Sequence, residues 1–191
     1  MTTDKQTTNY HSEFLTAYER TKNLGLNCPP FTSELAGKLC SPTFLREFPY
    51  LIRDNTNVLS PADLAHQCLY VNFLIKDIIS KRLNCEVYYT IGWIDCDDGD
   101  PMYKFDDEYI STALAHYGST RGALKVHAWL TLPTMEVIDP TLATSIALVQ
   151  NKPNGLGGVI AGKADDLQGF SYRPMLIGMD FLVRTGGMVV A

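Results

Sequence analysis

The sequence predicts an α+β fold in which helices come first and an antiparallel β-sheet follows. Apolar residues recur at helical spacing through the first third of the chain, and one long apolar stripe follows at 60–82. From residue 85 onward, β-branched and aromatic residues dominate the apolar runs, which is typical of strands. Because helices and strands are segregated along the chain rather than alternating, the strands are expected to pair antiparallel.

Two helices are predicted before residue 60. Segment 12–26, SEFLTAYERTKNLGL, carries Phe14 and Tyr18 at helical spacing, and Gly25 is suited to ending a helix. Segment 41–52, SPTFLREFPYLI, opens with a Ser-Pro pair and holds a second apolar cluster, which indicates a short helix. The first ten or so residues are polar and are expected to be flexible.

The strongest local signal predicts a long buried helix that begins at Ser60. Ser60 is a favourable N-cap residue, Pro61 suits the first helical position, and Asp63 completes a pattern like a capping box. Such a helix would place Cys68 more than two turns from its start, where the helix dipole has little effect. The residues of its stripe recur at steps of three and four: Leu64, Cys68, Val71, Ile75, Ile78 and Arg82.

The rest of the chain is predicted to be mostly strand and loop. Segment 85–94, CEVYYTIGWI, indicates a strand, and 95–101, DCDDGDP, indicates a solvated loop. The glycine-rich stretch 155–163, GLGGVIAGK, predicts a flexible loop that borders a cleft. Segments 172–184 and 186–191 are predicted to add edge strands to the sheet.

Size, charge and hydropathy predict one domain over residues 1–191. The net charge of -5 argues against nucleic acid as a partner, because phosphate binding needs a basic surface. No apolar run approaches the roughly 18 residues that a membrane span requires. The polar start of the sequence lacks the order of a secretory signal, so we expect a cytoplasmic protein; export by a signal-less route would leave the same sequence. Nothing in the sequence indicates an oligomeric state.

The five cysteines predict reduced thiols. Their number is odd and no CxxC spacing occurs, which disfavours both a disulfide framework and a four-cysteine zinc site.

A hairpin is predicted to bring a histidine beside an aspartate. Segments 124–132 and 135–142 are strand-like and flank a turn candidate at 132–134, so His127 and Asp139 could touch across the two strands. A carboxylate beside an imidazole fixes its tautomer and stabilises its protonated form, which is how a general base is oriented. Taken singly, each residue also has an ordinary structural explanation, because core histidines and turn aspartates are common.

Cys68 is the candidate nucleophile for this pair. If the long helix packs on the sheet, its first turns face the strand that carries His127. The alternative is that Cys68, which lies on the apolar stripe, is an inert buried thiol.

Several short motifs, in this order, resemble the transglutaminase-like core of the papain-like cysteine enzymes. They are QC at 67–68, KRLNCEVYYTIGWI at 81–94, HAW at 127–129 and DPT at 139–141. The resemblance covers about 60–142, under half of the chain. It departs from the family at Asn84 and His66, where glycine is usual, and no tryptophan precedes the cysteine.

The resemblance implies a papain-like, transglutaminase-like core in which a nucleophile helix packs on the antiparallel sheet. It implies that Cys68 is the nucleophile, that His127 transfers protons and that Asp139 orients His127. The backbone N–H of Cys68 is then one donor to the oxyanion. Gln67, Asn57 and Trp129 are candidates for a second donor or for contact with substrate.

The activity that follows is acyl transfer on protein or peptide amides, as in a protease, deamidase or transglutaminase. An arylamine N-acetyltransferase uses the same triad order, but its RCxE pattern is absent because Leu69 and Tyr70 follow Cys68. A non-catalytic protein-binding domain that retains the fold is the alternative outside enzymes. We expect no cofactor and no metal: the acidic stretch 95–100 has Gly99 at the fifth position of a calcium-type loop, where the EF-hand needs it at the sixth. Zinc held by Cys68 and His127 stays an open alternative.

Overall fold

The computed structural model describes residues 9–31, 33–58, 60–116 and 124–188, and within them the chain is α+β, as predicted. Its α-helices are α1 (Tyr10–Asn23), α2 (Pro42–Asn55), α3 (Cys68–Leu83), α4 (Asp107–Ala115), α5 (Leu142–Val149) and α6 (Asp180–Arg184). Its strands are β1 (Tyr88–Cys96), β2 (His127–Thr131), β3 (Glu136–Asp139), β4 (Ile160–Lys163) and β5 (Phe170–Ile177).

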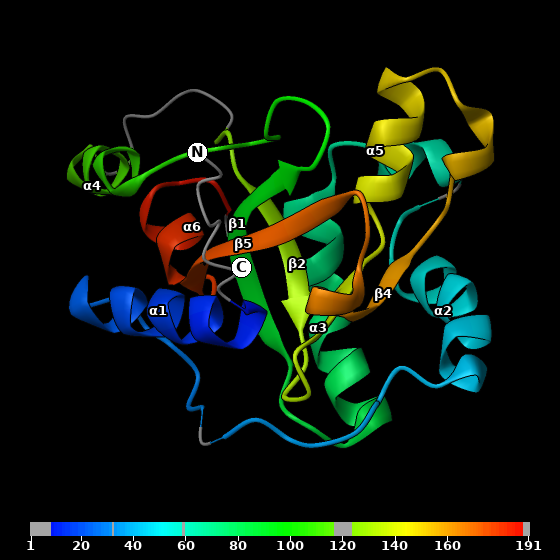
Figure 1. Ribbon diagram of the computed structural model, residues 1–191, viewed down its shortest axis with the longest axis horizontal. Coiled ribbons are helices and arrows are strands. Elements are labelled where there is room, and N and C mark those ends of the chain that lie inside the picture. Colours follow the sequence, from blue (N-terminus) through cyan, green and yellow to red (C-terminus); the bar gives the residue numbers. More distant parts are fainter. Residues whose placement is uncertain (1–8, 32, 59, 117–123, 189–191) are drawn as a thin grey trace, which may run out of the picture.

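The strands form one antiparallel sheet in the order β4-β3-β2-β1-β5 (Figure 1). The prediction of an antiparallel sheet is therefore confirmed. In the pairing of β1 with β2, Gly92 lies opposite His127. A Cβ atom at Gly92 would lie 2.1 Å from the carbonyl oxygen of Arg173 and 2.6 Å from the ring of Trp129, so only glycine allows this close approach.

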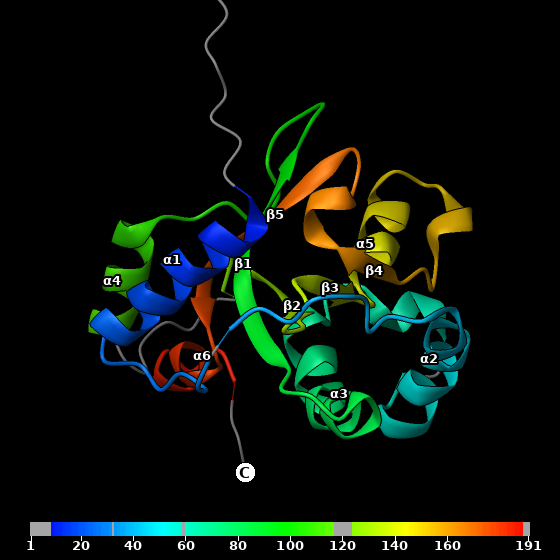
Figure 2. The ribbon, with the colours of Figure 1, turned by 60° about the horizontal axis from the view of Figure 1, so that its bottom comes forward.

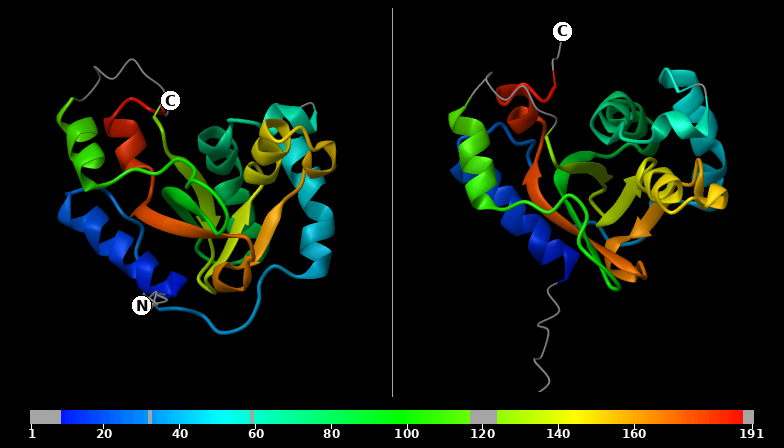
Figure 3. Two further views of the ribbon diagram at one scale, coloured as in Figure 1. Left: turned by 45° about the horizontal axis from the view of Figure 1, so that its top comes forward. Right: turned by 90° about the horizontal axis from the view of Figure 1, so that it is seen from above.

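Helices cover the sheet from two sides. Figures 2 and 3 show α2, α3 and α5 gathered on one side of β1, and α1, α4 and α6 on the other. Helix α3 packs against β2, and α1 packs against β5. Two clusters of buried apolar side chains result, one that includes α3 residues such as Val71 and Ile75 and one that includes α1 residues such as Phe14.

The prediction of one long helix from Ser60 is wrong about where the helix begins, because the helical run is broken just before Cys68. Residues 61–64 form a single 3-10 turn, in which the Ser60 N–H donates to the Asp63 carboxylate at 2.6 Å. Ala65 is then extended, and His66 adopts φ 60, in the left-handed region that ends a helix. Helix α3 starts afresh at Cys68, with Gln67 as its N-cap.

Other predicted elements differ in extent or type. Residues 160–163, predicted to be part of a flexible loop, form the edge strand β4. Residues 180–184, predicted to be strand, form α6, because Gly178 with φ 93 turns the chain after β5. Helices α4 and α5 were not predicted. The predicted flexible start lies mostly outside the described residues, as do the last three residues of 186–191, whose described part contains no strand.

The acidic loop after β1 is only partly the solvated turn that its composition predicts. Asp95 lies within β1, and its carboxylate pairs with Arg173 of β5 at 3.0 Å. Asp98 and Asp100 are exposed, as predicted. The loop is therefore fixed to the sheet at its beginning.

Candidate active site

Cys68 is the first residue of α3, where the sequence predicted a position two turns inside a helix. The N–H groups in the first turn of an α-helix have no partners within the helix, and the dipole there favours negative charge. The Cys68 side chain is largely buried, with 8% of the residue exposed. Its place at a helix start answers the objection that the helix dipole cannot reach Cys68, although the residue is still as buried as the apolar stripe implies.

His127 and Asp139 are in contact, as the hairpin predicted. Nε2 of His127 lies 2.6 Å from Oδ2 of Asp139, and both residues are buried. Leu130 lies opposite Ile138, so the two side chains meet on a diagonal rather than directly across the strands. Because His127 is the first residue of β2 and Asp139 the last of β3, the pair lies at one end of the hairpin.

The Asp139 carboxylate accepts hydrogen bonds on both oxygens. Oδ1 accepts from the backbone N–H and the hydroxyl of Thr141, each at 2.9 Å, and from the N–H of Leu142 at 3.0 Å. Oδ2 accepts from the Tyr172 hydroxyl at 2.9 Å as well as from His127. Burial alone would raise the pKa of Asp139, but the charge of His127 and these hydrogen bonds lower it. The carboxylate is therefore held ionised at the N-terminal end of α5.

His127 is held in a state that favours its protonated form. Burial lowers its pKa, but the charges of Asp139 and Cys68 outweigh burial and raise the pKa to about 10. Since Nε2 faces the carboxylate, the proton of the neutral ring belongs on Nε2. Nδ1 is buried without a hydrogen-bond partner of ordinary geometry among the described residues. Nδ1 is thus the nitrogen that can exchange a proton with Cys68.

Aromatic rings flank His127. The Tyr103 ring is stacked on it at 5.2 Å between centroids, and the Trp129 ring at 6.0 Å. Trp129 is fully buried, and its indole N–H donates to the Tyr10 hydroxyl at 2.8 Å. The indole N–H is therefore already used, which does not favour the predicted role of Trp129 as an oxyanion donor.

The other two predicted accessory residues are exposed. Gln67 precedes Cys68 at the start of α3, and its side chain makes no capping hydrogen bond there. Asn57 lies in the segment after α2, and none of the hydrogen bonds of His127 or Asp139 involves it. Gln67 is thus adjacent to the nucleophile, whereas Asn57 is not joined to the triad by any of these contacts.

Asn72 links the nucleophile helix to the histidine strand, and sequence reasoning missed it. It is fully buried, and its Nδ2 donates to the carbonyl oxygens of Cys68 and Ala128, each at 2.9 Å. Ala128 directly follows His127, so one amide group holds together the backbones that carry Cys68 and His127. The available signal was a polar residue one turn after Cys68 on the buried face of the helix.

Replacing Asn72 with leucine is expected to lower the free energy of unfolding by about 2 kcal/mol, because buried carbonyl groups lose their donor. Urea denaturation measures the change. Asn55→Leu is the matched control, since Asn55 donates to the carbonyl of Leu51 one turn back but on an exposed surface. Its loss is expected to stay within about 0.5 kcal/mol. Equal losses in the two variants would contradict the linking role of Asn72.

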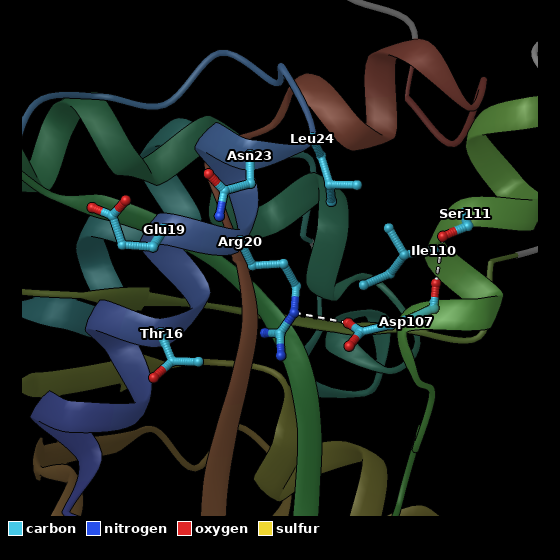
Figure 4. Close-up of a pocket in the computed structure, with 8 residues that line it drawn as sticks. All are labelled: Thr16, Glu19, Arg20, Asn23, Leu24, Asp107, Ile110 and Ser111. Atoms are coloured by element: carbon cyan, nitrogen blue, oxygen red, sulfur yellow. Dashed lines mark hydrogen bonds and ion pairs between the residues drawn. The ribbon is translucent and has the colours of Figure 1, made fainter.

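One cavity lies away from these residues. It measures about 570 Å³ and lies between α1 and α4, where Arg20 pairs with Asp107 at 2.8 Å (Figure 4). No member of the Cys68, His127 and Asp139 group lines it. Its residues are Thr16, Glu19, Arg20, Asn23, Leu24, Asp107, Ile110 and Ser111.

The described part of the chain contains neither a metal-binding cluster nor a membrane-spanning helix. Within the described residues, no group of three or more His, Cys, Asp or Glu side chains is placed to hold a metal ion. In the same part of the chain, every helix is too short or too polar to cross a membrane.

The geometry supports nucleophilic chemistry at Cys68. A thiol stands at a helix start, a histidine has one ring nitrogen free, and a buried carboxylate fixes the other nitrogen. These residues come from three elements: Cys68 begins α3, and His127 and Asp139 lie on the consecutive, paired strands β2 and β3. Comparisons of the chain with protein-family models, with curated proteins and with solved structures found no match.

Proposed function

We propose that this protein is a cysteine-dependent acyl-transfer enzyme that acts on protein or peptide amides. The observation that carries the proposal is the buried pair of His127 and Asp139. Nε2 of His127 contacts the carboxylate, and Nδ1 has no hydrogen-bond partner of ordinary geometry among the described residues. The charge of Cys68 helps to raise the pKa of the ring. A histidine in the protein core has no need of an ionised carboxylate with five hydrogen-bond donors. A proton-transfer group does, because the carboxylate orients the ring and stabilises its charge.

The proposed reaction begins when the proton of the Cys68 thiol moves to Nδ1 of His127. The sulfur attacks the carbonyl carbon of the amide, and the oxyanion that forms accepts the N–H of Cys68 at the start of α3. The C–N bond then breaks, and the leaving amine takes the proton from Nδ1. The products of this half-reaction are a thioester on Cys68 and a free amine.

The second half-reaction regenerates the thiol. Water, for a protease or deamidase, or an amine, for a transglutaminase, gives a proton to Nδ1 as it attacks the thioester carbon. The C–S bond breaks, and the Cys68 sulfur takes the proton back from His127. Asp139 keeps its charge throughout and stabilises the imidazolium in both halves.

The arrangement supports the papain-like, transglutaminase-like core that the motifs imply. A cysteine begins a helix, the helix packs on an antiparallel sheet, and the histidine and aspartate lie on neighbouring strands of that sheet. We propose this core as the fold type. A reducing compartment such as the cytoplasm suits the mechanism, since all five cysteines are free thiols.

An acyl-enzyme trap tests the proposal. The protein is mixed with p-nitrophenyl acetate, and separately with a glutamine-containing peptide, and its intact mass is followed after rapid acid quenching. We expect a mass increase of one acyl group on Cys68, absent in Cys68→Ala and retained in Cys40→Ala. Cys40 is the matched control because it is also buried but is distant in the chain from the triad.

Two outcomes count against an enzyme. Acylation spread over several cysteines would contradict a dedicated nucleophile. A folded protein whose Cys68 stays unmodified by every donor would favour a non-catalytic binding domain. Release of ammonia from the peptide, or incorporation of an added amine, would then separate deamidation from transamidation in an active protein.

Removal of divalent metals is expected to leave the reactivity of Cys68 unchanged within about twofold, because the thiol and the imidazole supply the nucleophile and the proton transfer. The measurement is the rate of Cys68 alkylation before and after dialysis against EDTA. Elemental analysis is the control. Zinc bound one to one, and lost in Cys68→Ala, would show that Cys68 is a metal ligand and would overturn the thiol mechanism.

A further inference from the structure

Tyr103 lies over the ring of His127 in a way that ordinary packing does not require. It belongs to the loop between β1 and α4, and its ring is stacked nearly parallel on the imidazole, with centroids 5.2 Å apart and an angle of 19° between the planes. Phe14 and Tyr88, by contrast, meet edge to face at 70°. A parallel stack presents the electron-rich face of the phenol to the imidazole.

The backbone holds Tyr103 in place at a conformational cost. Its φ is 60°, a left-handed value that is uncommon for a bulky aromatic residue and is found where surrounding structure enforces it. The preceding residue, Met102, exchanges two backbone hydrogen bonds with Ile94 of β1, at 2.9 and 3.0 Å. The bridge to β1 and the left-handed backbone together therefore fix the position of the residue.

The groups around the imidazole of His127 all influence its charge, so charge is the property of the ring that Tyr103 would affect. Asp139 of β3 and Cys68 of α3 act on the ring directly, and Tyr172 of β5 donates to Asp139. Burial and the charges of Cys68 and Asp139 raise the pKa of Tyr103, so it stays a neutral phenol. A neutral aromatic face over an imidazolium is a favourable cation–π contact, strongest where water is excluded.

We propose that Tyr103 is a positioning residue of the acyl-transfer site: its ring holds the plane of His127 so that Nδ1 faces Cys68, and it stabilises the imidazolium formed when the thiol gives up its proton. Tyr103 itself forms no bond in the reaction and acts through His127. The inference rests on the proposed function, because it assigns this role within the same site.

Two substitutions separate the ring from the backbone. Tyr103→Asn removes the ring but tolerates the left-handed backbone better than tyrosine does, so it is not expected to destabilise the loop. Tyr103→Phe keeps the ring and removes only the hydroxyl group. Phe48→Leu, in the buried core between α2 and α3, is the control for general loss of stability.

The measurement is the rate of Cys68 alkylation by iodoacetamide from pH 5 to 9. We expect Tyr103→Asn to slow alkylation at pH 6 about 30-fold, the factor of a water-excluded cation–π contact, and to move the acidic limb of the profile to higher pH. Tyr103→Phe should stay within about twofold of the wild type. Phe48→Leu should leave the profile in place even though it unfolds more easily.

The outcomes distinguish this inference from the proposed function. If wild-type Cys68 is not preferentially alkylated at pH 6, the proposed function fails; the role of Tyr103 is then decided by NMR titration of His127, which needs no reactive thiol. If wild-type Cys68 is reactive but the alkylation profile of Tyr103→Asn coincides with the wild-type profile, the inference is overturned. It is also overturned if Tyr103→Phe loses as much as Tyr103→Asn, or if Phe48→Leu produces the same shift.

Discussion

Brief iodoacetamide treatment at about pH 6 is expected to label Cys68 and to leave the other four cysteines nearly unmodified. Burial raises the pKa of Cys28 to about 11 and that of Cys40 to about 12, and it also raises the pKa of Cys85 and Cys96. Even an ordinary thiol, with a pKa of ~8.5, is ionised to only roughly 0.3% at this pH. Cys68 alone has His127 available to take its proton.

The expected advantage of Cys68 over the other thiols is about 10- to 100-fold in rate, after allowing for the lower nucleophilicity of an ion-paired thiolate. Peptide mapping by mass spectrometry measures it. In His127→Asn the advantage should disappear, because no base is left beside the thiol, while circular dichroism shows whether the fold persists. Preferential labelling of Cys28, Cys40 or Cys96 in the wild type would contradict the assignment of Cys68 as nucleophile.

Asp139→Asn is the second substitution expected to have a large effect. It should lower both the turnover and the free energy of unfolding. If the amide oxygen of the substituted side chain still accepts hydrogen bonds from the N–H groups of Thr141 and Leu142, the NH₂ group of the same side chain faces Nε2 of His127. Nε2 must then accept, so the ring proton moves to Nδ1 and points at Cys68. In a serine-protease triad the equivalent change costs ~10⁴ in turnover, and we expect about 10²–10³ here because cysteine depends less on a separate base.

The loss of stability in Asp139→Asn should depend on pH in a defined way. The pKa of His127 is raised from 6.5 to about 10. Its contribution to the free energy of unfolding is therefore complete below about pH 6.5 and is lost as pH rises toward 10. The pKa of Asp139 is lowered from 3.8, so its contribution is present above that pH and is lost as pH falls through the folded value. The pair therefore stabilises most between about pH 4 and 6.5.

Thermal unfolding at pH 5.5 and at pH 9 checks this. We expect Asp139→Asn to lose roughly 3 kcal/mol at pH 5.5, the scale of hydrogen bonds to a charged group, and less at pH 9. Tyr172→Phe is the matched control, since it removes one donor to the same oxygen and leaves the tautomer of His127 unchanged. An equal loss at both pH values, with turnover intact, would show that Asp139 only shapes the turn before α5.

Local patterns were sufficient to predict the class of fold and to name the three residues of the candidate site. Strand-forming runs on either side of a short turn predict a hairpin, and a hairpin alone is enough to bring His127 within reach of Asp139. The order QC, HAW and DPT singled out Cys68. The hairpin is a short-range pattern, and the motifs are recognised by their order in the sequence. Both kinds of pattern can be read from the sequence alone.

The start of α3 could not be predicted in the same way. Ser60, Pro61 and Asp63 suit the first turn of an α-helix and of a 3-10 turn equally well, because both leave the same N–H groups to be capped. The tertiary structure decides between them: the 3-10 turn packs against α5, Leu64 is buried, and the left-handed His66 redirects the chain. That break places Cys68 at a helix start.

The sequence by itself therefore predicted which side chains form the candidate site, whereas only the tertiary structure decided how they are held. Asn72 reaches a carbonyl of β2, Tyr172 reaches Asp139 from β5, and Tyr103 reaches His127 from a loop. Each of these contacts joins elements that are far apart in the chain. Their existence depends on how α3, α5 and the loop after β1 pack on the sheet, and packing is set by the sum of many long-range contacts rather than by any local pattern.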